Sequence, residues 1–311
     1  MDKKYFETIQ KVTKQMNELE LKKDRFIAGE KLCETLLNEA YGSFPGQYKS
    51  VKELVNSLIN KKNSGEFIDN GNEVKITTSG EVVGVGKVNV ISYWSTTKAN
   101  ENDMVKGESI VKNNIQTIIL HIKTANIPFY ELPTTIAHEI MHCFQQKLPK
   151  NNGVNEKTMI LYHYIPMFLT KNYTDFCYYF FYGMYITYSF EMSANISSVS
   201  SFIGEYFKNR NKNEITTMEY VDALKKCDKY NAYESVLNLL PKIKITKTDI
   251  DYIKKCMTGT FKNMFGNGED IVLYNSETFN TEAFICKAKQ DIIKKCQETI
   301  EKMYGKIRKS T

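Results

Sequence analysis

The motif H-E-x-x-H at residues 138–142 constrains this chain more than any other feature of its sequence. On a helix, His138 and His142 lie one turn apart on the same face, so two imidazole nitrogens can bind one Zn²⁺ ion. Glu139 then points beside the metal and can act as general base for a zinc-bound water. The motif therefore predicts a metal-binding helix that carries a hydrolytic site.

This helix is expected to span about residues 134–147. Apolar residues recur through it at helical spacing, and Thr134 or Thr135, just after Pro133, is a plausible N-cap. The chain has only four histidines, so a chance occurrence of the motif has a probability of roughly 1 in 200. The alternative interpretation is a pair of surface histidines on an ordinary helix.

A catalytic zinc site needs a third protein ligand and one open coordination position. A third histidine six residues after the motif is absent, because Leu148 occupies that position. Glu191 is the candidate instead, since it is the only acidic residue between Asp175 and Glu205. It interrupts an apolar, aromatic stretch, where a carboxylate would be buried and would need a partner such as a metal ion.

Two neighbours of Glu191 favour this assignment. Ala194 is small enough to let a second helix lie close to the metal helix, and Asn195, one turn after Glu191, could accept a hydrogen bond from a ligand imidazole. The alternatives are that Glu191 pairs with a lysine at a helix end, or that Glu156 or Glu205 is the third ligand.

On these residues the chain resembles the gluzincins, the thermolysin-like branch of the zincin metallopeptidases. The resemblance covers residues 115 to about 201 and is carried by His138, Glu139, His142 and the pattern E-x-x-A that begins at Glu191. It departs at Asn195, where thermolysin-like enzymes have Asp. It implies a zincin-like α+β fold with a small mixed or antiparallel sheet, an active-site helix and mostly helical flanking regions.

The residue that stabilises the oxyanion cannot be chosen by composition, because the chain has 20 tyrosines. His163 lies between the two ligand segments, and Tyr188 lies one turn before Glu191. Either could take this role. The alternative for each is simple packing in the core or at the rim of the site.

The order of patterns divides the chain into a helical N-terminal region 1–65, a zincin catalytic core 66–205 and a helical C-terminal region 206–311. Strands are expected at 74–78, 82–85, 88–93 and 115–123. The resemblance makes the strand at 115–123 the candidate edge strand along the substrate cleft. His121 in this strand is expected to be structural or to lie at the rim. A buried helix is expected over 176–190, and a final amphipathic helix over 281–306.

Charge and composition narrow the partners. The net charge of +6 is modest for 311 residues, so neither nucleic acid nor a membrane is expected as a partner. No signal peptide and no apolar run of membrane-spanning length is visible. The seven cysteines include no C-x-x-C pair, which favours reduced thiols and a cytoplasmic location. The oligomeric state is left open.

We therefore expect a zinc metallopeptidase that acts on a peptide or protein substrate. His138, His142 and Glu191 bind zinc, and Glu139 is the general base. One alternative is a binding or scaffold protein that keeps a zincin fold with a structural zinc or none. The other is an effector or toxin protease with one narrow target.

Overall fold

The computed structural model describes residues 45–82, 84–95, 105–112, 115–123, 130–146, 156–169, 174–210, 215–263 and 269–308. Most of the predicted N-terminal helical region 1–65 lies outside these residues. The chain forms two compact units, each of them discontinuous in sequence. The first takes in the chain up to Asn152 and Ser193–Cys227, and the second takes in Gly153–Met192 and Asp228–Thr311.

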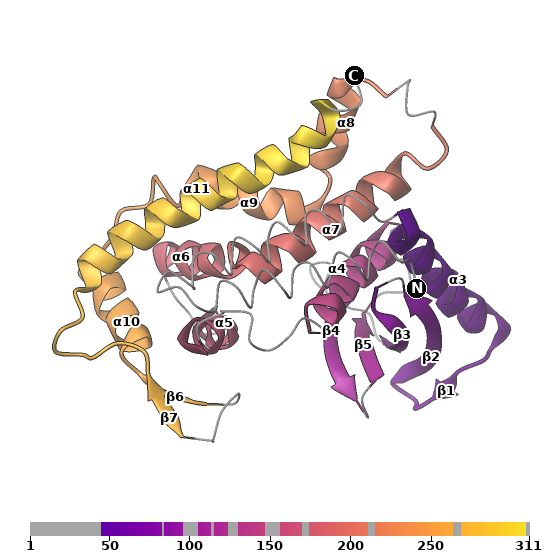
Figure 1. The fold of residues 1–311 in the computed structure, drawn as a ribbon, viewed down its shortest axis with the longest axis horizontal. Coiled ribbons are helices and arrows are strands. Elements are labelled where there is room, and N and C mark those ends of the chain that lie inside the picture. Colours follow the sequence, from indigo (N-terminus) through magenta and orange to yellow (C-terminus); the bar gives the residue numbers. More distant parts are fainter. Residues whose placement is uncertain are drawn as a thin grey trace, which may run out of the picture. The chain divides into compact units, whose positions relative to one another are not determined.

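The first unit contains a mixed five-stranded sheet with the strand order β1-β2-β3-β5-β4 (Figure 1). Strands β3 and β5 run parallel, and the other neighbours run antiparallel. The predicted α+β class is therefore confirmed. The strands are β1 (Ile68–Asp69), β2 (Glu73–Val82), β3 (Gly86–Ser95), β4 (Val105–Lys112) and β5 (Ile115–Ile122).

The hairpin of β2 and β3 corrects one strand prediction. Two separate strands were predicted at 74–78 and 82–85. The structure has a single strand instead, because β2 runs without a break to Val82 and the chain then turns. Gly84 and Gly86 have φ angles of 79° and 84°, in the left-handed region that glycine adopts without steric cost. The glycines therefore make the turn that ends β2.

The edge of the sheet also differs from the prediction. The strand predicted at 115–123 is β5, and it lies inside the sheet between β3 and β4. The edge is β4, which the sequence did not reveal, because its pattern VKGESIVK mixes charged and apolar residues without a clear alternation. His121 of β5 is exposed and stacks on Tyr93, as expected for a structural or rim residue.

Helices α3 (Pro45–Ser64) and α4 (Glu131–Gln146) pack on the sheet and against each other. The helix predicted at 134–147 is thus α4, but the predicted N-cap is wrong. Thr134 and Thr135 lie inside the helix, and their hydroxyls donate to the carbonyl oxygens of Tyr130 and Glu131 at 2.5 and 3.0 Å. A threonine hydroxyl bonds back to the preceding turn in this way when the helix has already begun.

The first unit also holds α8 (Thr217–Leu224) and most of α7 (Ser189–Tyr206). Helix α7 includes the end of the segment predicted as one buried helix over 176–190. That prediction is wrong, because α6 ends at Ile186 and Thr187 caps it, with its hydroxyl donating to the Gly183 carbonyl at 2.6 Å. The chain then restarts as α7 at Ser189.

The second unit is mainly helical and has its own buried side chains. A small hairpin of β6 and β7, absent from the predictions, packs through Phe261 and Leu273 against Ile160 of α5. The elements of the second unit are α5 (Glu156–Leu169), α6 (Asp175–Ile186), α9 (Asp228–Leu239), α10 (Lys247–Met257), β6 (Thr260–Lys262), β7 (Asp270–Val272) and α11 (Thr281–Arg308).

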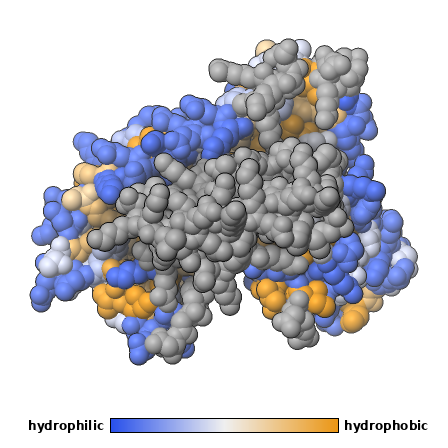
Figure 2. Space-filling view, viewed as in Figure 1, coloured by the Kyte–Doolittle hydropathy of each residue, from blue (hydrophilic) through white to orange (hydrophobic). Residues whose placement is uncertain are grey.

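Helix α11 is amphipathic, as the sequence predicted. Its buried side chains Ile285, Ile292, Cys296 and Met303 share one face, and the helix packs on α6, α9 and α10. Figure 2 shows a mainly hydrophilic surface along this helix. No helix among the described residues has an apolar stretch long enough to cross a bilayer.

Candidate metal centre

His138 and His142 come from successive turns of α4 and converge. Their Nε2 atoms lie 3.1 Å apart, and His138 is only 6% exposed. Two ligands at about 2.0 Å from one tetrahedral ion would lie roughly 3.3 Å apart, so the nitrogens are already near the spacing that one metal ion requires. Two nitrogens this close share one hydrogen between them, and a metal cation can replace that hydrogen.

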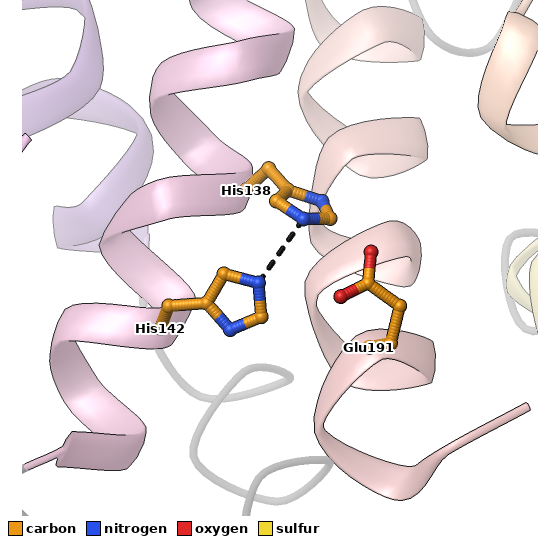
Figure 3. Close-up of side chains that lie close together, drawn as sticks. All are labelled: His138, His142 and Glu191. Carbon is orange, nitrogen blue, oxygen red and sulfur yellow. Dashed lines mark hydrogen bonds between the residues drawn. The ribbon is translucent and has the colours of Figure 1, made fainter. Parts of the chain in front are cut away.

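Glu191 is the third member of this cluster. Its carboxylate and the two imidazoles each offer one ligand atom, and these atoms all lie within 4.8 Å of one another. Figure 3 shows the three side chains pointing toward one another from α4 and α7. Glu191 is 2% exposed and lies in the first turn of α7, where the helix dipole favours a negative charge.

Helix α7 is held against α4 by hydroxyl groups. Ser197 and Ser198 donate to the carbonyl oxygens of Ala137 and Thr134, both at 2.9 Å. Ala194 is fully buried on the same helix, and its role in letting the two helices approach closely stays a prediction. Because Glu191 belongs to this continuous helix, these contacts help to position its carboxylate near the histidines.

Glu139 is buried at 5% exposure beside the cluster and is not one of its three members. Strand β4 passes directly over it. A β-carbon built on Gly107 would lie 2.8 Å from Glu139 Cγ and 2.9 Å from its Oε1. The backbone of the edge strand therefore lies in contact with the carboxylate that the motif assigns as base.

Gln145 supports one of the histidines, although it was not among the residues predicted from the sequence. Its Oε1 lies 2.7 Å from His142 Nδ1. An amide oxygen only accepts, so Nδ1 donates, and the lone pair of the ring is then on Nε2, which faces the cluster. The available signal was the spacing of three residues on one helix, which places Gln145 on the face of His142.

Tyr162 is the second residue that the sequence did not single out. Its hydroxyl donates to Glu191 Oε2 at 2.8 Å. Burial, followed by the negative charge of Glu191, raises the pKa of Tyr162 well above its usual value, so the phenol stays protonated and remains a donor.

The two residues proposed for the oxyanion differ in their surroundings. His163 is exposed on α5, with its ring edge-on to Tyr164. Tyr188 is 8% exposed and stacks on Tyr162 with ring centroids 4.3 Å apart. Tyr188 is thus linked to Glu191 through Tyr162, while the oxyanion role of either residue stays a prediction.

The other acidic candidates are placed as follows. Glu205 is buried near the end of α7, and its carboxylate pairs with Lys208 at 3.2 Å. It lies fourteen residues after Glu191, about 21 Å along the helix, too far to share a ligand site. Glu156 begins α5, and its side chain lies outside the described residues. Asn195 is 2% exposed on α7, and its support of an imidazole stays a prediction.

Two imidazole nitrogens and one carboxylate form a donor set of the kind that binds a catalytic metal ion. Among the described residues, no other group of three or more potential ligands was found. No family model, no curated protein and no solved structure matches this chain.

Proposed function

We propose that this chain is a zinc-dependent metallopeptidase of zincin-like fold. The observation that carries the proposal is the close packing of β4 at Gly107 on Glu139, which follows His138 in the sequence, together with the cluster of His138, His142 and Glu191. A metal cluster alone fits many functions. A metal-dependent peptide hydrolase needs a general base in addition, and Glu139 is a buried carboxylate that is not part of the cluster.

Zinc is the metal of the proposal because two imidazoles and one carboxylate form the ligand set of catalytic zinc sites. When bound, the ion supplies Lewis acidity, which polarises a carbonyl group and makes a water molecule more acidic. His138 and His142 would hold it through Nε2, and Glu191 through its carboxylate. Gln145 keeps the His142 ring in the tautomer that this binding needs.

Glu139 would move the proton. Water adds its oxygen to the scissile carbonyl carbon, and Glu139 takes the proton that the water loses. The carbon–nitrogen bond then breaks, and Glu139 returns this proton to the amine nitrogen of the leaving chain. Because Glu139 is buried, it is shielded from bulk solvent during both transfers.

Strand β4 supports a polypeptide as the substrate class. Within the described sheet, β4 is an edge strand that pairs only with β5, and an extended chain would add to its other side. An added strand binds through main-chain hydrogen bonds, which depend little on sequence. Gly107 would place such a chain next to Glu139.

The test uses purified full-length protein loaded with zinc and a broad peptide library. The wild type should cleave library members, and a chelator should stop the cleavage. Glu139→Gln should keep zinc and fold but lose hydrolysis by several orders of magnitude, because it removes the proton acceptor without touching a ligand. Zinc binding without any cleavage would favour a zincin-fold binding protein instead. Cleavage restricted to one sequence would favour a narrow-specificity protease.

A further inference from the structure

Tyr162 makes a direct hydrogen bond to the proposed metal ligand Glu191. Its hydroxyl donates to Oε2 at 2.8 Å, a normal length for a hydrogen bond between two oxygens. The acceptor belongs to a carboxylate that is 98% removed from solvent, since Glu191 is 2% exposed. The phenol therefore supplies part of the solvation that this buried charge has lost.

The ring of Tyr162 stacks on two other tyrosines. Tyr185 stacks on it with a centroid distance of 5.2 Å and an interplanar angle of 2°, and Tyr188 does so at 4.3 Å and 22°. Tyr185 lies on α6, and Tyr188 directly precedes α7. The stacking restricts movement of the whole Tyr162 side chain, and therefore of the hydroxyl that bonds to Glu191.

The backbone ties the same residues together. The amide of Met192 donates to the carbonyl oxygen of Tyr188 at 2.8 Å, which closes the first turn of α7 around Glu191. Tyr162 thus packs on the residue that starts this turn and bonds to the side chain that the turn presents. Both contacts fix the direction of the carboxylate.

We propose that Tyr162 is a positioning residue that holds the Glu191 carboxylate so that it binds the metal through one oxygen. The inference rests on the proposed metal site and extends it. With Oε2 engaged by the phenol, the carboxylate cannot rotate freely to bind the ion through both oxygens. One-oxygen binding leaves a coordination position open, which a catalytic zinc site needs and a structural site does not.

The test compares Tyr162→Phe with the wild type as full-length protein. Zinc affinity is measured by competition with a chromophoric chelator, and the coordination is followed by the visible absorption of bound Co²⁺. Tyr162→Phe should bind zinc about ten-fold to a hundred-fold more weakly, as expected for loss of a group that orients a ligand. Its Co²⁺ absorption should weaken and shift, because binding through two oxygens raises the coordination number.

Tyr164→Phe is the matched control. Tyr164 lies on the same helix, and its hydroxyl bonds to the backbone of Lys262 at 3.1 and 3.3 Å rather than to Glu191. This variant should match the wild type in zinc affinity and in the Co²⁺ spectrum. Tyr162→His, which keeps a ring and a donor, should retain more affinity than Tyr162→Phe. Melting of the metal-free proteins checks that each variant folds.

A double variant shows whether Tyr162 acts through Glu191. In a Glu191→Gln background, Tyr162→Phe should cause little further loss of affinity, since the two changes disturb one interaction. An equal loss in both backgrounds would overturn the proposal, as would a Tyr162→Phe protein with wild-type affinity and spectrum. If the wild type itself binds neither zinc nor Co²⁺, the metal site is wrong and this role of Tyr162 fails with it.

Discussion

Gly107 of the edge strand and Glu139 of α4 are in such close contact that glycine is the only residue that fits. A β-carbon at Gly107 would meet Glu139 Cγ at 2.8 Å and Thr135 Cγ2 at 2.9 Å. Both contacted side chains stand on a helix that is packed against the sheet, so neither can move away without cost. The glycine is required here for space, and the position of Glu139 depends on it.

Gly107→Ala should therefore displace the Glu139 carboxylate. We expect a stability loss of about 1–3 kcal/mol from overpacking. Zinc content should stay near that of the wild type, because no ligand is touched. Hydrolysis should fall by on the order of a hundred-fold, since a displacement of about 1 Å at a catalytic group has this effect. Metal analysis, thermal melting and a peptide assay on the same sample check the three expectations.

Gly80→Ala provides the control within the same sheet. Gly80 lies on β2, and its added β-carbon would meet only the side chain of Leu54, at 3.1 Å. Zinc content and hydrolysis should both be unchanged. If Gly107→Ala kept full activity, Glu139 would not depend on the strand, and the proposed approach of substrate along β4 would lose its support.

The histidines of α4 should be essential for metal binding. The purified wild type should hold about one zinc per chain, and His138→Ala or His142→Ala should abolish binding. His121→Ala is the control, because this histidine is exposed and stacks on Tyr93 in the sheet. Elemental analysis after gel filtration measures the zinc content. Full occupancy in either α4 variant would show that the ligands are elsewhere.

Glu191 should be the third ligand. Glu191→Ala should weaken zinc affinity strongly and lower the melting temperature of the zinc-loaded protein, because metal binding adds to the free energy of folding. Glu205→Ala is the control from the same helix, since it removes a buried acid that pairs with Lys208 instead. A zinc titration followed by calorimetry compares the two. Wild-type affinity in Glu191→Ala would falsify the assignment.

Gln145 and Asn195 should act through the imidazoles. Gln145→Ala should reduce zinc affinity about ten-fold to a hundred-fold, because His142 then loses the acceptor that fixes its tautomer. Asn195→Ala is expected to reduce zinc affinity within the same range, but by less than Gln145→Ala does. Chelator competition ranks the two variants. If Gln145→Ala left the zinc affinity unchanged and Asn195→Ala reduced it, the role assigned to Gln145 would be wrong.

The part of the site that follows from local periodicity could be predicted from the sequence. The spacing of four residues in an apolar helical pattern was sufficient to place His138 and His142 on one face of α4. Glu191 required a different argument, because it lies 49 residues after His142 in the sequence. It could be selected because a lone acid in an apolar stretch is costly to bury without a partner.

Contacts that arise only in the folded chain were not accessible in this way. Tyr162 is one of 20 tyrosines, and its bond to Glu191 joins residues 29 positions apart in the sequence, which only the folded chain brings together. Strand β4 was missed because one of its faces is solvated, so exposed charged residues such as Lys106 and Glu108 mask the apolar pattern of a strand. Without β4, β5 was wrongly predicted to be the edge.

The exposed edge of β4 has one more consequence, for the behaviour of the protein at high concentration. An open strand edge can pair with the same edge of another molecule and start aggregation. Lys106, Glu108 and Lys112 are exposed along β4, and charged groups oppose such pairing. The side-chain amide of Gln146 also donates to the Ser109 carbonyl oxygen at 3.1 Å and removes one acceptor that a second molecule would use. The charged groups and this bond thereby protect the strand against self-association.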